Sequence, residues 1–270
     1  MNQRDKRRKF GQNYLKDPAI LFEIEQSISP QPNDKFFEIG PGMGALTSIL
    51  NKENISITAI DIDEFNISYL KKEFSGPATF NFIQDNILDN DLNILAKEMH
   101  RIAGNLPYNI STQIILKMIK YNKRIKDMHF LVQKEVAEKI AGAPGTKDWG
   151  KMGIKLAAFF TTEILFDVPP EAFDIKPKVN SSFIRMTPLK DKLLEDEKIK
   201  DFFEIIDLSF TSRRKNIKNN LKNKNIEWSK IGINGRKSFL YQCKNSARKR
   251  FFPRSRLRQM TYRKLKPHAS

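Results

Sequence analysis

The segment NLPYNIS, at residues 105–111, combines an amide, a proline and a phenol at the end of a short apolar run. The side-chain carbonyl of Asn105 can accept a hydrogen bond, and the Leu106 carbonyl can accept another because Pro107 keeps it out of a helix. Two such acceptors would hold an exocyclic amine in line with an electrophile, and Tyr108 offers a face on which an extruded base can stack. The segment suits alkylation of a base, although an Asn-Pro loop with a core tyrosine would contain the same residues.

A glycine-rich segment follows the apolar run at 34–40. Gly40, Gly42 and Gly44 would let backbone N–H groups approach a ligand closely. The match to the dinucleotide-binding pattern G-x-G-x-x-G is incomplete, because Ala45 occupies the third glycine position. An ordinary strand-to-helix turn remains the alternative interpretation.

Two acids end the next two predicted strands. Asp61 can accept hydrogen bonds from both hydroxyls of a ribose, and Asp85 can accept one from an adenine amino group. Each acid can instead cap a helix or lie in a solvated turn. Within the glycine segment, Pro41 and Glu38 favour a nucleoside attached to an amino acid over a pyrophosphate.

A shared site would require secondary-structure elements that bring the glycines, both acids and the NLPYNIS segment to one edge of a sheet. Apolar runs and helical periodicity alternate along the first half of the chain, which predicts an α/β fold with a Rossmann-like, doubly wound parallel sheet. Ligands of such sheets bind at the carboxyl ends of the strands. The predicted strands span 34–40, 55–61, 78–85, 100–105, 127–133 and 162–168, and the predicted helices span 43–52, 64–74, 110–122, 134–142 and 154–160.

The remaining chain predicts a second domain. An extended segment at 181–189 is followed by a charged linker at 190–198, and an amphipathic helix begins at residue 199. We therefore predict a catalytic domain at 1–189 and a small basic helical domain at 190–270.

The chain carries a net charge of +17, and 12 of its 48 Lys and Arg residues lie in the tail at 236–270. Two further basic clusters lie at 4–9 and 212–224. Basic clusters at several points suit a polyanion such as a nucleic acid, because Lys and Arg release counterions when they neutralise phosphates. Solubility or attraction to a membrane surface would explain the same charge.

Several classes of protein are disfavoured. With Cys243 as its single cysteine and three scattered histidines, the chain suggests neither a disulfide nor a metal site. The N-terminus lacks the apolar region of a signal peptide, and the chain has no apolar run of about 18 residues. We expect a cytoplasmic protein without a membrane span.

Six motifs, taken together, resemble the ribosomal RNA adenine dimethyltransferase family, with the likeness running from about Lys9 to about Asn223. In chain order they are FGQNYL, FEIGPGMGALT, NLPYNIS, QKEVAEK, PKVNSSFIRM and RRKNIKNNL. The resemblance implies a class I methyltransferase fold that uses S-adenosyl-L-methionine. The implied reaction is direct transfer of a methyl group to adenine N6, repeated on each base, without a metal.

The resemblance also implies residue roles. Asn13 and Leu15 would close over the cofactor, Asp61 would hold its ribose and Asp85 would contact its adenine. The full set implied for the cofactor is Asn13, Leu15, Gly40, Gly42, Asp61, Asp85 and Asn105.

The target adenine would be held by the segment from Asn105 to Tyr108, with Leu106 and Pro107 between them. Phe173 would stack on the other face of the base, although Ile175 replaces the proline usual two residues later. The residues implied for RNA phosphates are Arg213, Arg214, Lys215 and Lys218.

Within the family, the likeness is greatest to the bacterial enzymes that dimethylate two adjacent adenines near the 3′ end of 16S rRNA. The implied partner is the small ribosomal subunit or its precursor, and we expect a monomer. The alternatives are a 23S rRNA methyltransferase of the macrolide-resistance type, a DNA adenine methyltransferase, which Asn105 and Leu106 disfavour, and a non-catalytic RNA-binding assembly factor. The tail at 236–270 departs from the family pattern, and we assign no site to it.

Overall fold

The structure is a computed structural model that describes residues 13–143, 146, 148–191, 194, 196–212 and 217–221. The chain divides into two compact units, Met1–Ala137 with Thr162–Pro188, and Glu138–Thr161 with Leu189–Ser270. The sequence predicted a single boundary after residue 189. The grouping of 138–161 with the C-terminal unit was not predicted.

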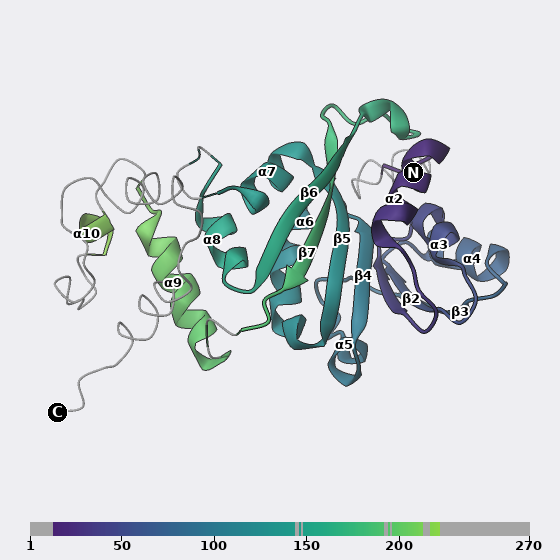
Figure 1. The fold of residues 1–270 in the computed structure, drawn as a ribbon, viewed down its shortest axis with the longest axis horizontal. Coiled ribbons are helices and arrows are strands. Elements are labelled where there is room, and N and C mark those ends of the chain that lie inside the picture. The colour runs from purple at the N-terminus through teal and green to yellow at the C-terminus, as the bar shows by residue number, and fades with distance from the viewer. Residues whose placement is uncertain are drawn as a thin grey trace. The chain divides into compact units, whose positions relative to one another are not determined.

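A seven-stranded sheet in the order β3-β2-β1-β4-β5-β7-β6 organises the fold (Figure 1). The first five strands pair in parallel, as the alternation of strands and helices predicted. The strands are β1 (Lys35–Ile39), β2 (Ser56–Asp61), β3 (Thr79–Gln84), β4 (His100–Asn105), β5 (Ile125–Gln133), β6 (Phe160–Val168) and β7 (Ser181–Pro188).

The sheet is mixed rather than wholly parallel. Strand β7 pairs with β5 in antiparallel register, with Phe130 opposite Ile184. The connection from β6 to β7 contains only the short 3-10 helix η2 (Pro170–Ala172). Because a parallel crossover usually needs a full helix, these two strands become neighbours at the end of the sheet instead.

The central strands are buried on both faces. Phe36, Phe37 and Ile39 of β1 and Ile102 and Ala103 of β4 are at most 1% exposed. This burial explains why Phe36, Phe37 and Ile39 of β1, and Ile102 and Ala103 of β4, do not follow an alternating apolar and polar pattern. The carboxyl ends of β1, β2 and β4 are therefore held by a packed core.

The helices confirm most of the sequence-based predictions, with two additions. Helices α2 and α5 were not predicted; α2 begins at Pro18, where the Asp17 side chain accepts from the backbone N–H groups of Ala19 and Ile20. Figure 1 shows α2, α3 and α4 on the side of the sheet where β2 and β3 lie. The helices are α2 (Pro18–Ile28), α3 (Ala45–Leu50), α4 (Glu64–Glu73), α5 (Asn93–Lys97), α6 (Ser111–Lys117), α7 (Lys134–Ala141), α8 (Lys151–Ala157), α9 (Ile199–Ser209) and α10 (Ile217–Asn220), with 3-10 helices η1 (Met118–Arg124) and η3 (Asp196–Lys198).

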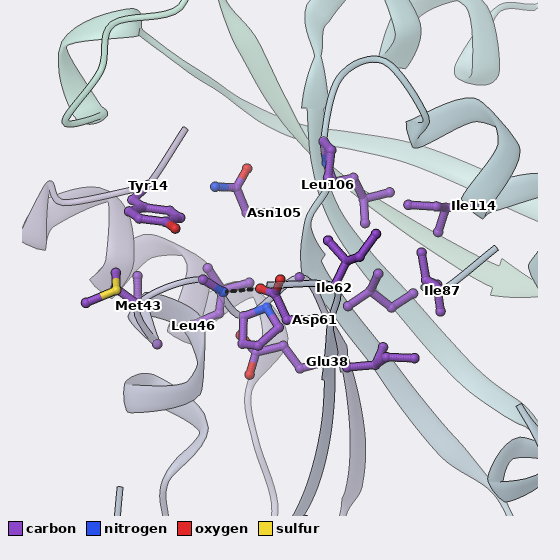
Figure 2. Close-up of a pocket in the computed structure, with 18 of the residues that line it drawn as sticks. Tyr14, Glu38, Met43, Leu46, Asp61, Ile62, Ile87, Asn105, Leu106 and Ile114 are labelled. Carbon is purple, nitrogen blue, oxygen red and sulfur yellow. Dashed lines mark hydrogen bonds between the residues drawn. The ribbon is translucent and has the colours of Figure 1, made fainter. Parts of the chain in front are cut away.

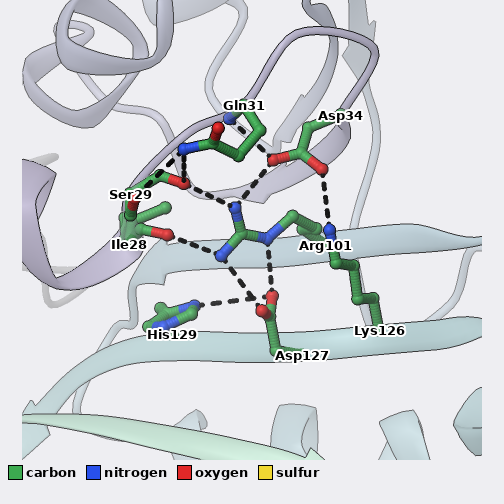
Figure 3. Close-up of polar contacts among 8 residues, drawn as sticks. All are labelled: Ile28, Ser29, Gln31, Asp34, Arg101, Lys126, Asp127 and His129. Atoms are coloured by element: carbon green, nitrogen blue, oxygen red, sulfur yellow. Dashed lines mark hydrogen bonds and ion pairs between the residues drawn. The ribbon is translucent and has the colours of Figure 1, made fainter.

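A buried ionic cluster lies at the amino ends of β4 and β5 (Figure 3). Arg101 donates to both carboxylate oxygens of Asp127, at 2.9 and 3.0 Å, and to Asp34 Oδ2 at 2.7 Å. It also donates to the carbonyls of Ile28 and Ser29, at 2.6 and 3.2 Å. The guanidinium thus ties the end of α2 to two central strands, and its charge is matched by two carboxylates.

His129 of β5 lies next to this cluster. The side chain is 1% exposed, and neither ring nitrogen has a hydrogen-bond partner within the described part of the chain. Its Nδ1 lies 3.7 Å from Asp127 Oδ1, and its ring stacks on Phe183 at a centroid distance of 6.0 Å. Burial lowers the pKa of His129 to about 4, because the imidazolium would lose its hydration.

The second unit has its own packing between α8 and α9. Lys155 of α8 donates to Asp207 Oδ2 at 2.8 Å, and its ammonium lies 4.6 Å from the centre of the Phe203 ring. Of the helices described, none has the length and the apolar character needed to cross a membrane.

Candidate active site

A cavity of about 490 Å³ lies at the carboxyl ends of β1, β2, β3 and β4 (Figure 2). This volume is within the range of small-molecule sites. Figure 2 shows Tyr14 and Met43 on one side of the cavity and Ile87 and Ile114 on the other. The sequence-predicted residues that line it are Asn13, Leu15, Gly40, Gly42, Asp61, Asp85, Asn105, Leu106, Pro107 and Tyr108.

The turn after β1 requires glycine at two positions for steric reasons. Gly42 has φ +56° and Gly44 has φ +85°, both in the left-handed region. A Cβ at Gly42 would lie 2.7 Å from the Tyr14 ring, and one at Gly44 would lie 2.4 Å from the Phe74 ring. The turn is therefore packed against two aromatic rings, and its backbone forms one wall of the cavity.

Asp61 ends β2 with its carboxylate already engaged. Its Oδ2 accepts from Gly42 N at 3.2 Å and from Asn66 Nδ2 at 3.1 Å, and its Oδ1 accepts from Asp63 N at 2.9 Å. Burial raises the pKa of Asp61 and these hydrogen bonds oppose the rise. Since a carboxylate has about four acceptor positions, one remains on Oδ1 for a ligand hydroxyl.

Asp85 follows β3 on the exposed side of the cavity. Its Oδ2 accepts from Asn90 Nδ2 at 2.7 Å and its Oδ1 from Asn86 N at 2.7 Å. The bond from Asn90 is the main reason that the pKa of Asp85 is lowered. Lys117 of α6 secures the same loop by donating to the Leu88 and Asn90 carbonyls, at 2.7 and 2.5 Å.

The NLPY segment forms the rim of the cavity beyond β4. Asn105 Nδ2 donates to the backbone carbonyl of Asn13 at 2.7 Å, which orients the amide and leaves Oδ1 as the acceptor. Leu106 N donates to the Leu131 carbonyl at 3.1 Å. Within the described residues no group donates to the Leu106 carbonyl, so that acceptor is also available.

Tyr108 is half-buried beside this rim. Its hydroxyl lies 2.6 Å from the Ser181 Oγ at the start of β7. Burial raises the pKa of Tyr108, so the phenol is neutral at pH 7. The hydrogen bond fixes the ring from its polar end.

Glu38 is a buried acid below the glycine turn, 1% exposed. Its Oε2 accepts from Thr47 Oγ1 at 2.7 Å. Burial raises the pKa of Glu38 to about 7, because few groups replace the water lost by the carboxylate. The sequence analysis noted Glu38 only as part of the glycine segment.

Sequence reasoning missed two other residues of the site, Tyr14 and Asn66. Tyr14 lines the cavity, and its hydroxyl donates to Asn66 Oδ1 at 3.0 Å. The position of Tyr14 between Asn13 and Leu15 was a usable signal. Asn66 lies within the predicted helix at 64–74, and nothing in that pattern distinguished it.

Phe173 does not lie at the cavity. Its side chain is 0% exposed within the hydrophobic core, and its backbone pairs with Leu15. In this position the ring cannot stack on a base, so the implied stacking role of Phe173 does not fit the structure. The reason is that the backbone around Phe173 forms hydrogen bonds with residues 14–16: Lys16 N donates to the Ala172 carbonyl, and Asp174 N donates to the Tyr14 carbonyl.

The basic cluster cannot be placed. Arg213, Arg214 and Lys215 lie outside the described residues, and Lys218 is described only as part of the backbone of α10. Their contact with RNA phosphates stays a prediction.

Solved structures show which fold the chain has. The 23S rRNA methyltransferase ErmE has a TM-score of 0.68 at 23% identity, covering 93% of this chain and 100% of its own. A dimethyladenosine transferase from Plasmodium falciparum also has a TM-score of 0.68 at 23% identity, covering 87% and 88%. The fold is that of the class I S-adenosylmethionine-dependent methyltransferases.

Within that class the family follows from sequence. The family model described as ribosomal RNA adenine dimethylase matches residues 3–247. The chain belongs to this family of S-adenosyl-L-methionine-dependent enzymes.

Named relatives are similar over most of the chain. Ribosomal RNA small subunit methyltransferase A of Legionella pneumophila is 42% identical over 216 residues, which is 80% of this chain and 84% of the relative. The protein of the same name from Neisseria meningitidis is 39% identical over 223 residues, or 82% and 85%.

The cavity fits the cofactor of this family. Asp61 and Asp85 follow adjacent parallel strands, as the ribose and the base of a nucleoside require. Ile62 and Ile87 add apolar surface to the lining, and the glycine turn forms the wall next to the Asp61 carboxylate.

Proposed function

We propose that this protein transfers methyl groups from S-adenosyl-L-methionine to N6 of two adjacent adenines near the 3′ end of 16S rRNA, twice on each base. One observation carries the proposal: Asn105 and Leu106 line the same cavity as Asp61 and the glycine turn, and within the described part of the chain no group donates to Asn105 Oδ1 or to the Leu106 carbonyl. Acceptors next to a cofactor site suit an amine that attacks the cofactor.

When bound, the cofactor supplies a methyl group that is activated because it is attached to a positively charged sulfonium sulfur. In the first transfer Asn105 and Leu106 would each accept one hydrogen of the adenine amine, and in the second transfer one of them would accept the single hydrogen that remains. These hydrogen bonds would localise the nitrogen lone pair and aim it. Tyr108 would stack on the base, its ring held by Ser181. No strong general base is needed, since the nitrogen proton becomes acidic once the nitrogen is alkylated.

The choice of 16S rRNA is supported by the relatives named small subunit methyltransferase A. The basic clusters suit an RNA substrate, because phosphate contacts supply most of the sequence-independent affinity. A cytoplasmic location and a monomeric state fit this substrate and stay predictions.

The test is methyl transfer from labelled S-adenosyl-L-methionine to small subunits that lack the modification. Large subunits and duplex DNA serve as the control substrates, and the product nucleosides are identified by mass. The expected product is N6,N6-dimethyladenosine from small subunits alone.

Other outcomes would replace the proposal. Label in large subunits would favour the 23S rRNA activity. Cofactor binding without transfer to any substrate would favour the RNA-binding assembly factor.

A further inference from the structure

We propose that Tyr14 and Asn66 are positioning residues that align Asp61 for the cofactor through a chain of hydrogen bonds from the N-terminal segment. This inference deepens the proposed function, since it rests on the assignment of the cavity to S-adenosyl-L-methionine. None of the sequence motifs assigns a role to Asn66 or to the hydroxyl of Tyr14.

The chain of contacts is continuous. The Tyr14 hydroxyl donates to Asn66 Oδ1 at 3.0 Å, and Asn66 Nδ2 donates to Asp61 Oδ2 at 3.1 Å. Asn66 is 0% exposed, so its amide has no water to replace either partner. The contacts join residues from the N-terminal segment, α4 and β2.

Tyr14 determines which end of the Asn66 amide faces Asp61. An amide has one oxygen and one NH₂ group, and a half-turn exchanges them. If the amide turned, its oxygen would face the Asp61 carboxylate, two acceptors would meet, and one buried donor would be lost. The hydroxyl of Tyr14 holds the oxygen away from Asp61, so the NH₂ group faces the carboxylate.

A second contact from Tyr14 reaches the same point. Its ring covers Gly42 so closely that a Cβ there would lie 2.7 Å from the ring. Gly42 N in turn donates to Asp61 Oδ2 at 3.2 Å. Tyr14 therefore contacts both groups that donate to Oδ2, Asn66 and Gly42. Together with the bond from Asp63 N to Oδ1, these contacts fix the carboxylate, and so they fix the direction of the open acceptor position on Oδ1.

The N-terminal segment itself is fixed by the catalytic rim and by the β6–β7 connection. Asn105 Nδ2 holds the Asn13 carbonyl at 2.7 Å, and Asp174 Oδ1 accepts from Tyr14 N at 3.1 Å. The alignment of Asp61 thus depends on the same segment that bonds to Asn105.

The experiment measures the binding of S-adenosylhomocysteine by titration calorimetry, without any RNA. Tyr14→Phe keeps the ring over Gly42 and removes only the hydroxyl. We expect it to weaken binding about 3- to 10-fold, the range of one neutral hydrogen bond, and Asn66→Ala to weaken it at least as much. With cofactor saturating, kcat should stay within about 2-fold of wild type, so the change falls on KM.

The double variant distinguishes a relay from two separate effects. Because Tyr14 acts on Asp61 through Asn66, adding Tyr14→Phe to Asn66→Ala should cause little further loss. If Asn66→Ala does not fold, Asn66→Ser takes its place in the cycle. Tyr121→Phe is the matched control, since its hydroxyl donates to the Asp91 carbonyl outside the cavity, and it should bind as wild type.

Each other outcome overturns the inference. Unchanged binding in Tyr14→Phe, or equal losses that add in the double variant, would show that Tyr14 does not act through Asn66. A wild-type chain that methylates RNA while the variants bind normally would overturn this inference alone. A wild-type chain that binds no S-adenosylhomocysteine would overturn the cofactor assignment as well.

Discussion

A single amide at the end of β4 meets two demands at once. The NH₂ group of Asn105 holds the Asn13 carbonyl, and its oxygen remains as an acceptor at the rim of the cavity. One residue thus links closure of the N-terminal segment to the proposed capture of an amine.

Replacing this amide should separate catalysis from cofactor binding. We expect Asn105→Ala to lower kcat by about 100-fold or more, the usual effect of removing one preorganised group at the reacting centre. The affinity for S-adenosylhomocysteine should change only a few-fold. Single-turnover methyl transfer and calorimetry would measure the two quantities.

A matched control is Asn81→Ala, because Asn81 is exposed on β3 and does not line the cavity. This variant should keep the wild-type rate. Near-normal turnover in Asn105→Ala would remove Asn105 from the proposed mechanism.

Tyr108 contributes a ring and a hydroxyl, which two variants can separate. Tyr108→Ala should weaken capture of the target base by about 1–3 kcal/mol, the usual value of one stacked base. Tyr108→Phe keeps the ring and loses only its bond to Ser181, so its loss should be smaller. The rate of transfer at subsaturating small subunits would measure both, and equal losses would argue against stacking.

At the scale of single residues, the sequence predicted the site residues that lie within one motif. It missed contacts between residues that are far apart in the chain. The segment 105–108 and both acids were predicted to lie at strand ends, and they do line one cavity. The contact of Tyr14 with Asn66 joins positions 52 residues apart. No periodicity encodes such a contact, and the burial of Phe173 was missed for the same reason.

At the scale of elements, the close pairing of β1 and β4 sets the position of the NLPY segment. A Cβ at Gly104 would lie 2.7 Å from the Ile39 carbonyl oxygen, a backbone atom that cannot move independently. We expect Gly104→Ala to destabilise the protein by about 1–3 kcal/mol, the usual cost of overpacking a core. Chemical denaturation would measure this loss.

The control for this substitution is Gly150→Ala. Gly150 has an extended backbone, and the nearest atom to a Cβ there is 4.0 Å away. Because Gly150 is the N-cap residue of α8, where alanine is less favourable than glycine, the loss of stability should stay below about 1 kcal/mol. Equal stability of the two variants would contradict the tight packing of β4 against β1.

The elements themselves were largely predictable, but their order in the sheet was not. Apolar runs and alternating patterns locate each strand to within about two residues, because the central strands are buried on both faces and β3 and β6 are partly exposed. Strand direction leaves no trace in such a run, so the antiparallel β7 was missed. Helix α2 was missed although Asp17 and Pro18 form an ordinary N-terminal cap.

For the whole molecule, two buried groups should give opposite dependences of stability on pH. Glu38 has a pKa raised from 4.5 to about 7, so its contribution to stability falls as pH rises through that window. His129 has a pKa lowered from 6.5 to about 4, so its contribution falls as pH drops through that window. Between pH 4.5 and 6.5 the two dependences offset each other in the wild-type chain.

Replacing either Glu38 or His129 should reveal the pH dependence of stability that the other residue causes. Glu38→Gln keeps an acceptor for Thr47, and between pH 4.5 and 7 its stability relative to wild type should rise by about 3 kcal/mol. His129→Leu should gain relative to wild type as pH falls from 6.5 toward 4. Denaturant midpoints at several pH values would measure both, and profiles parallel to wild type would show that neither group titrates as described.

For the whole molecule, we expect the Arg101 cluster to slow unfolding. Its bonds join Arg101 to Ile28, 73 residues away, and to Asp34, 67 residues away. Contacts across such loops become favourable only after the loop entropy has been lost, so they form late in folding. Interactions that are absent from the folding transition state mainly slow unfolding. We therefore expect this cluster at the amino ends of the strands to extend the lifetime of the site built at their carboxyl ends.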